Sequence, residues 1–392
     1  MKYANFTGGK MHQKIGLYLH IPYCVQKCRY CDFLSFAGRY GTDGKMYFNA
    51  LREELRSLAD SFGRESGCRI GSVFIGGGTP SVAESREIAE TVELVRRVFY
   101  VEKNAEITVE ANPGTVTREK LNAFYRAGIN RLSLGVQSLD DGVLKAMGRI
   151  HSAHEAEQAY DMARSAGFQN INMDLILGFP GQSLSVFTET LKKAVALRPE
   201  HISAYSLIVE EGTPLFADIR GGLVPEPEQD ADREMYHSAC RFLREAGYVR
   251  YEISNFARPG YESRHNKGYW TGVYYLGAGL GAASYLPGER FKNTEDMRAY
   301  LERPPDQKRD RDFDEFLSLK DEMNEFMMLG FRLAEGPDEG AFAFKFKMPY
   351  TQVYRTQLRK LLEQGLIEKS AAGYCLSAKG LDFGNLVFEE FV

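Results

Sequence analysis

A regular alternation of short β-branched runs and amphipathic stretches in the first half of the chain constrains its fold more than any other feature. The predicted strands are residues 15–21, 72–75, 106–109, 131–134, 172–177 and 201–207. The predicted helices are residues 46–62, 81–99, 118–127, 153–166 and 184–196. Apolar positions in the helices recur every three and four residues. Repeated strand–helix units predict parallel βα pairs, and hence an α/β barrel or a doubly wound sheet.

Unusual residues collect where each predicted strand ends. These segments are residues 20–24, 76–80, 110–113, 135–138, 174–182 and 205–207. The carboxyl ends of parallel barrel strands form one face, which carries the active site. Turn chemistry explains the glycines and prolines of these segments, but it does not explain Glu110, Gln137 and Asp174. We therefore expect a functional site at this end of the barrel.

Composition indicates an ordinary globular protein with no general affinity for nucleic acid. The chain has 392 residues, 26% of them charged, and a formal net charge of −4. This length predicts two or three folded units, and the charge gives no general attraction to polyanions. We find no apolar run of about 18 residues and no signal peptide in residues 1–16. We expect a cytoplasmic protein without a nucleic-acid partner or transmembrane segment; peripheral membrane contact stays open.

Three of the six cysteines form a C-x3-C-x2-C motif in the loop after the first strand: Cys24, Cys28 and Cys31. Thiolates are the usual ligands of iron–sulfur clusters. The motif resembles that of the radical S-adenosylmethionine (SAM) superfamily, which implies a [4Fe–4S] cluster with one iron left open for SAM. The alternative is a structural zinc site with His20 as fourth ligand. Zinc ligands usually come in two separated pairs, whereas these share one loop.

The other strand ends offer groups that suit SAM. Glycine allows close approach of a ligand to the backbone, as in Gly76–Gly78. Glu110 and Asp174 are suited to ribose hydroxyls or to the ammonium group, and Arg149 could hold a carboxylate through two hydrogen bonds. For each of these charged residues, a surface ion pair is the alternative interpretation.

The second half is predicted to form a different unit. Residues 225–229 resemble a hinge, after which we expect helices near residues 232–246, 322–333 and 352–364 and a hairpin within 365–377. Helices followed by a hairpin predict a winged-helix-like module. Its mixed charges favour a structural role over DNA binding. We place a barrel at residues 10–245 and a C-terminal domain at residues 246–392, with the winged-helix-like module at about 313–392.

Several segments together resemble the oxygen-independent coproporphyrinogen III oxidase family: residues 18–24, 76–80, 110–113, 134–138 and 174–182. The resemblance runs from about residue 15 to the C-terminus. It implies a partial six-stranded (β/α)6 barrel with a mostly helical C-terminal domain. It also implies SAM contacts for eight residues: Tyr18, Gly77, Gly78, Thr79, Glu110, Gln137, Arg149 and Asp174.

Two departures from the oxidases resemble the related haem chaperones called HemW. Phe33 stands where the oxidases have a fourth cysteine, and only 23 residues precede Cys24. Residues 264–270, RHNKGYW, match the HNxxYW motif of HemW proteins. Imidazole is a common axial ligand of haem iron, and aromatic rings offer flat apolar surface. We therefore predict a haem site at His265, Tyr269 and Trp270; the alternative is a packed seam between two domains.

The sequence thus predicts a haem chaperone that delivers haem to haem-requiring proteins, such as those of the respiratory chain. It would hold a SAM-binding [4Fe–4S] cluster, with haem as cargo. The alternative from another class is an oxygen-independent coproporphyrinogen III dehydrogenase, which decarboxylates two propionates by radical chemistry. Phe33 and the 264–270 motif argue against it. A zinc-dependent binding module is the third interpretation.

Overall fold

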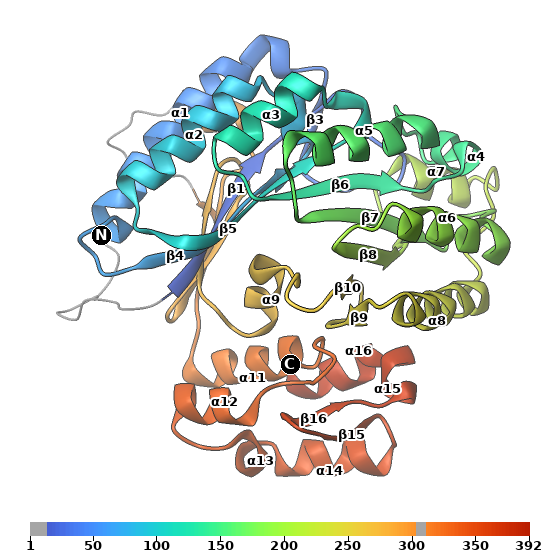
Figure 1. Ribbon diagram of the computed structural model, residues 1–392. Helices are drawn as coiled ribbons and strands as arrows, with labels where there is room; N and C mark the ends of the chain where they lie inside the picture. The colour runs from blue at the N-terminus through green and yellow to red at the C-terminus, as the bar shows by residue number, and fades with distance from the viewer. Residues whose placement is uncertain (1–13, 303–310) are drawn as a thin grey trace.

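A computed structural model describes residues 14–302 and 311–392, so residues 10–13 of the predicted barrel lie outside the described residues. The largest sheet has 12 strands in the order β14-β13-β12-β11-β1-β4-β5-β6-β7-β8-β10-β9 (Figure 1). Its centre is the predicted parallel set: β1 (Lys14–Ile21), β4 (Arg69–Gly77), β5 (Val101–Ala111), β6 (Arg131–Gln137), β7 (Ile171–Leu177) and β8 (His201–Ser206). The two ends of this sheet do not pair, so the barrel is partial, as predicted.

Helices connect these strands and cover the outer face of the sheet (Figure 1). They are α1 (Tyr40–Phe62), α2 (Ser85–Val98), α3 (Arg118–Arg126), α4 (Asp141–Ala146), α5 (Ala153–Ala166), α6 (Leu184–Ala196), α7 (Pro214–Arg220) and α8 (Gln229–Glu245). Four begin at a hydroxyl cap, because the side chains of Thr117, Ser152, Ser183 and Thr213 accept hydrogen bonds from backbone N–H groups of the first turn. The helix predicted at 81–99 starts later, at Ser85, since Pro80–Val82 forms a separate 3-10 turn.

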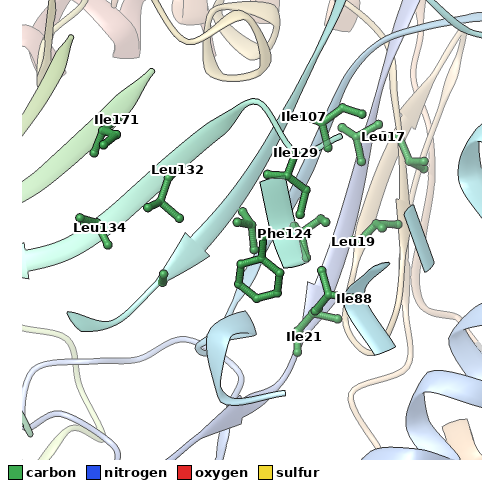
Figure 2. Close-up of a cluster of buried hydrophobic side chains, with 14 of the residues drawn as sticks. Leu17, Leu19, Ile21, Ile88, Ile107, Phe124, Ile129, Leu132, Leu134 and Ile171 are labelled. Atoms are coloured by element: carbon green, nitrogen blue, oxygen red, sulfur yellow. The ribbon is translucent and has the colours of Figure 1, made fainter. Parts of the chain in front are cut away.

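The main core lies between the sheet and these helices. Alternate residues of a strand point to opposite faces, and the outward set is apolar. Figure 2 shows this layer with Leu17, Leu19, Ile107, Leu132 and Leu134 packed together. Each buried leucine or isoleucine stabilises the fold by roughly 1.5–3 kcal/mol. The residues between them, which are largely polar, face the inner side of the partial barrel.

The sheet extends further than the sequence predicted. Short strands lengthen both edges: β9 (Val249–Arg250), β10 (Asn255–Ala257), β11 (Tyr275–Ala278), β12 (Ala283–Leu286), β13 (Glu289–Asn293) and β14 (Arg311–Phe316). Between them lie α9 (Arg264–Trp270) and α10 (Met297–Leu301). Strands on both sides of residues 245 and 246 thus share one sheet, and the domain boundary placed there stays a prediction. A small separate sheet pairs β2 (Tyr23–Cys24) with β3 (Phe36–Ala37).

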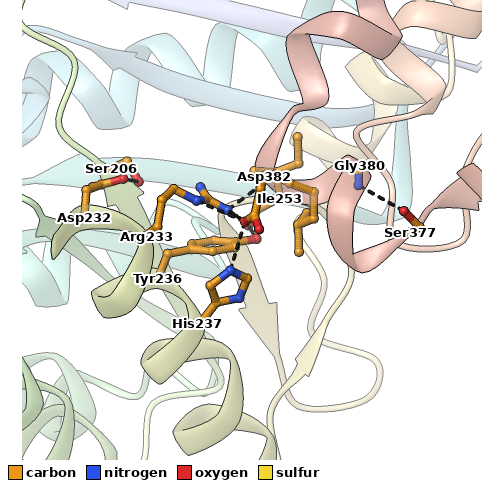
Figure 3. A network of polar contacts seen from close by, with 10 residues as sticks. Ser206, Asp232, Arg233, Tyr236, His237, Ile253, Ser377, Gly380 and Asp382 are labelled. Carbon is orange, nitrogen blue, oxygen red and sulfur yellow. Dashed lines mark hydrogen bonds and ion pairs between the residues drawn. The ribbon is translucent and has the colours of Figure 1, made fainter. Parts of the chain in front are cut away.

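The C-terminal residues form the predicted helices and hairpin around a core of their own, which includes Met327, Phe331 and Phe342. The elements are α11 (Leu319–Gly330), α12 (Glu339–Phe346), α13 (Tyr350–Val353), α14 (Arg355–Glu363), β15 (Ile367–Ser370), β16 (Gly373–Leu376), α15 (Ala378–Asp382), α16 (Gly384–Phe388) and a 3-10 turn at Glu389–Phe391. Polar contacts join this unit to α8: His237 Nε2 lies 2.9 Å from Asp382, which also pairs with Arg233 (Figure 3). In the described parts of the chain, no helix is long and apolar enough to cross a membrane.

Candidate functional site

Cys24 ends β2, and Cys28 and Cys31 lie in the loop between β2 and β3; all three thiols are free and partly exposed. Side chains from later segments reach two of them. Thr79 Oγ1, just after β4, lies 3.4 Å from Cys24 Sγ, and Arg149 Nη1, between α4 and α5, donates to Cys28 Sγ at 3.3 Å. The cysteine loop is therefore tied to the end of β4 and to the segment that follows α4.

Three thiols in one short segment can serve as ligands of a cluster. Among the described residues, no three His, Cys, Asp or Glu side chains are grouped so as to hold one metal ion. A cluster binds each cysteine to a different iron, so its ligands surround a volume instead of a point. Burial raises the pKa of Cys31 to about 11, so metal binding at this residue must release a proton.

His20 is already engaged, which weakens the zinc interpretation. Its Nε2 lies 2.9 Å from the carbonyl oxygen of Leu34 and donates to it. Its Nδ1, 3.0 Å from Tyr18 Oη, must then accept from that hydroxyl. Burial lowers the pKa of His20, which keeps the ring neutral. A zinc ion bound at either ring nitrogen would cost the hydrogen bond that this nitrogen makes.

The glycine-rich end of β4 fits closely against the cysteine loop. Gly77 has a φ of +115°, a conformation that other residues rarely adopt. A Cβ on Gly78 would lie 2.8 Å from the carbonyl oxygen of Tyr23. The N–H groups of Gly78 and Thr79 donate to backbone carbonyls at 2.9 and 2.7 Å, and that of Gly77 donates to Glu110 Oε2 at 3.0 Å. Because these donors are occupied, the segment can offer a ligand carbonyl oxygens, which suit an ammonium group.

Two carboxylates on the inner face lack a positive partner. Burial, followed by the negative charge of Asp174, raises the pKa of Glu110 to about 8. Asp174 accepts hydrogen bonds from Ser133 Oγ at 2.9 Å and Asn172 Nδ2 at 2.8 Å. No lysine or arginine of the described residues pairs with either carboxylate. A cationic ligand such as SAM, with its sulfonium and ammonium groups, would supply the missing charge.

The segment between α4 and α5 places the guanidinium of Arg149 between the end of β6 and the cysteines. Gln137 has a φ of 66°, and the pairing of β6 with β7 shifts between Gly135 and Gln137. Arg149 Nη2 donates to the carbonyl oxygen of Gly135 at 2.5 Å. Its Nε is buried without a partner among the described residues. This donor fits a ligand carboxylate.

All eight predicted SAM residues therefore lie on the inner face or at the strand ends around the cysteine loop, and several contact one another. Phe33, at the place of the oxidases' fourth cysteine, is 63% exposed. The donor set fits both a cluster and SAM, although the individual contacts stay predictions.

The predicted haem residues lie at the opposite end of the strands, on α9. Residues 264–270 are helical, and Glu106 holds the start of the helix by accepting from the N–H groups of Arg264 and His265 at 3.1 and 3.2 Å. A Cβ on Gly16 would lie 3.2 Å from the His265 ring. Gly16 precedes His20 by four residues of β1, so His265 sits roughly 13 Å below the level of His20, at about 3.3 Å per residue.

Both nitrogens of His265 are used within the protein. Nδ1 lies 3.0 Å from Ser72 Oγ and Nε2 lies 2.9 Å from Tyr269 Oη. The ring stacks on Phe74 with centroids 5.2 Å apart. Burial, with the charge of Arg131 second, lowers the pKa of His265 to about 3, so the ring is neutral. Iron ligation therefore requires one of these hydrogen bonds to open.

A cavity of about 290 Å³ adjoins this histidine. Its lining includes Lys14, Gly16, Ser72, His265, Lys267 and Tyr269. This volume is slightly below the usual range for pockets that enclose drug-sized ligands. Only one edge of a haem macrocycle would fit in this cavity unless α9 moves.

Comparison with known proteins identifies the family. A haem chaperone HemW from Lactococcus lactis is 35% identical over 375 residues, which are 96% of this chain and 96% of that protein. Another, from Escherichia coli, is 36% identical over 96% of this chain and 98% of that protein. This chain belongs to the HemW family. Two family models agree: the radical SAM superfamily matches residues 18–194, and the HemN C-terminal domain matches residues 317–383.

A solved structure supports the fold of this HemW family member. Coproporphyrinogen III oxidase (HemN) from Escherichia coli matches 97% of this chain and 91% of its own with a TM-score of 0.83. Its sequence identity of 23% limits the likeness to architecture. Membership of the radical SAM superfamily implies a [4Fe–4S] cluster and SAM, in agreement with the prediction from Cys24, Cys28 and Cys31.

Sequence reasoning missed the residues that position α9. Glu106, Ser72 and Phe74 each contact the helix from a distant strand, and Tyr251 Oη accepts from the N–H of Ser263, the residue before α9. The alternation of polar and apolar residues in β4 and β5 was a usable signal, because polar residues on a face opposite the core require partners.

Proposed function

We propose that this protein is a haem chaperone: it binds haem and passes it to haem-requiring proteins, among them respiratory ones. Similarity over 96% of the chain to proteins named haem chaperone HemW carries this proposal. A cytoplasmic location belongs to the same proposal. SAM and the cluster can supply one-electron chemistry when bound; the chain's own residues hold and shield them.

Haem binding at α9 is the finer part of the proposal. Tyr269 Oη lies 2.9 Å from His265 Nε2, so rotation of the tyrosine would free a neutral imidazole nitrogen for iron. Lys14 and Lys267 at the cavity could pair with propionates. The guanidinium of Arg332 lies over the ring of Trp270, 4.4 Å from the ring centre. We expect Trp270 to contribute to haem binding through contact area.

Haem titration of anaerobically prepared variants tests this proposal. His265→Ala should weaken haem binding and shift the Soret band, with iron–sulfur content and SAM binding near wild type. Tyr269→Ala and Trp270→Ala should weaken binding with smaller spectral changes. His151→Ala is the matched control, because His151 is equally buried, at 4% exposure, but makes its hydrogen bonds to Asn112 and Val136. Wild-type affinity and spectrum in His265→Ala would place the iron ligand elsewhere.

A further inference from the structure

A continuous chain of buried hydrogen bonds crosses the inner face of the barrel. It begins at Asp174, a predicted SAM residue in β7, whose Oδ1 accepts from Asn172 Nδ2 at 2.8 Å. Asn172 Oδ1 lies 2.6 Å from His201 Nδ1. His201 Nε2 lies 2.9 Å from Tyr251 Oη, which accepts from the N–H of Ser263 at 3.2 Å. Ser263 caps α9 by accepting from Asn266 N–H, so the chain ends at the start of the helix that carries His265.

Each bond in this chain has one possible direction. A carboxylate accepts, so the Asn172 amide must point its NH₂ group at Asp174 and its oxygen at His201. That oxygen requires a donor, so His201 carries its proton on Nδ1 and accepts at Nε2. Burial, with the charge of Arg131 second, lowers the pKa of His201 well below its ordinary value, which agrees with a neutral ring. The Tyr251 hydroxyl must therefore donate to His201, which leaves its oxygen to accept from Ser263.

The side chains in the middle of this hydrogen-bond chain are buried and have little freedom to change position. His201, Asn172 and Ser263 are at most 2% exposed, and Tyr251 is 8% exposed. Ser203 Oγ donates to Asn172 Oδ1 at 3.2 Å, and Asn172 Nδ2 also donates to Ser133 Oγ at 2.7 Å. Both N–H donors and the carbonyl oxygen of the Asn172 side chain therefore have partners inside the protein. Hydrogen bonds that all run in one direction polarise one another, so a change at one end alters the strength of the others.

We propose that His201 and Tyr251 are positioning residues that couple SAM bound at Asp174 to the position of α9, and thereby to haem affinity; this proposal rests on the proposed function. Hydroxyl donors of the SAM ribose would compete with Asn172 for the Asp174 carboxylate. The weakened bond shifts Asn172, His201 and Tyr251 in turn and alters the anchor of Ser263. Coupling between two sites is reciprocal: each ligand changes the affinity of the other by one common factor.

The test uses the full-length, cluster-loaded protein under anaerobic conditions, with SAM and haem as probes. Haem affinity is measured with and without SAM, and SAM affinity with and without haem. For the wild type we expect one common factor of about five, at the lower end of usual allosteric couplings. Trp270, at the end of α9, is the only tryptophan of the chain, so its fluorescence reports on α9 when SAM is added without haem.

Tyr251→Phe removes the hydroxyl that links His201 to Ser263 while nearly conserving volume. We expect the coupling factor to fall to about one, and the response of Trp270 to SAM to disappear. Tyr248→Phe is the matched control: Tyr248 is buried nearby, but its hydroxyl donates to the carbonyl of Pro199 at 2.7 Å, outside the chain. His201→Gln breaks the previous link and serves if Tyr251→Phe is unstable.

The outcomes separate this proposal from the proposed function. Equal coupling in wild type and Tyr251→Phe, or a wild type in which SAM changes neither haem affinity nor Trp270 fluorescence, overturns the coupling. If His265→Ala still lowers haem affinity in that case, the proposed function stands. A different result is also informative: Trp270 fluorescence responds to SAM only when Tyr251 is present, but His265→Ala binds haem like the wild type. The link from SAM to α9 is then supported, and the proposed haem site at His265 is refuted. Absence of SAM binding by the wild type overturns the coupling as well.

Discussion

Glu110→Gln should make the protein more stable at high pH while it abolishes or strongly weakens SAM binding. Folding raises the pKa of Glu110 from its ordinary 4.5 to about 8, first through burial and then through Asp174. Between these pH values the native state binds a proton that the unfolded chain has lost, so its stability falls as pH rises through this window. One unit of pKa difference corresponds to about 1.36 kcal/mol, which sets a ceiling near 5 kcal/mol. Glu110 keeps some solvent contact, so we expect about 2–3 kcal/mol.

The assay is denaturant unfolding of wild type and Glu110→Gln at pH 5 and pH 9, without SAM. The contributions of other titrating groups cancel when the unfolding free energies of the two proteins are subtracted. From pH 5 to pH 9 this difference should change by about 2–3 kcal/mol in favour of the glutamine variant. Added SAM should reduce the difference in unfolding free energy between the two proteins at pH 9, because a cation beside Glu110 stabilises its ionised form. An unfolding difference that is constant between pH 5 and pH 9 would refute the assigned environment of Glu110.

Three further predictions concern the cluster, the reaction and the left-handed glycine. Anaerobically reconstituted protein should hold about four irons and four sulfides, and changing Cys24, Cys28 or Cys31 to Ser should remove them without unfolding the barrel; stoichiometric zinc in protein prepared without oxygen would contradict this. The protein should not convert coproporphyrinogen III to protoporphyrinogen IX, because Phe33 replaces a cysteine; rescue of a strain lacking its oxidases would reverse the conclusion. Gly77→Ala should cost about 1–3 kcal/mol in unfolding free energy, since its φ is +115° and a Cβ would meet the His20 ring at 2.6 Å; unchanged stability would show that this turn relaxes.

Local patterns sufficed to predict the parallel strands and the position of the predicted SAM residues near their carboxyl ends. Glycine and proline mark strand ends through their own backbone preferences. The sequence GGGTP at residues 76–80 therefore indicated the end of a strand before the structure was known. The short strands β11–β14 could not be predicted in this way, because each has only four to six residues and a segment with glycines at 277, 279 and 281 runs from β11 toward β12. Position along the sequence also says little about α9: Glu106 holds His265 across 159 residues of chain. The sequence identified the motif at 264–270, but the place of α9 beneath the sheet depends on such distant contacts.

The two ends of the inner face differ in the groups that a ligand would meet. At α9, both nitrogens of His265 have hydrogen-bond partners and Glu106 caps the helix backbone, although Trp270 Nε1 is buried without a partner among the described residues. At the cysteine end, Glu110 has a raised pKa and Arg149 Nε is buried without a partner among the described residues. Unsatisfied buried groups cost stability unless a ligand completes them. The cysteine end is therefore preorganised for its ligand, whereas α9 must exchange internal hydrogen bonds for the iron. Haem binding therefore requires an opening at α9 itself, whereas SAM binding acts on α9 only through the hydrogen bonds of His201 and Tyr251.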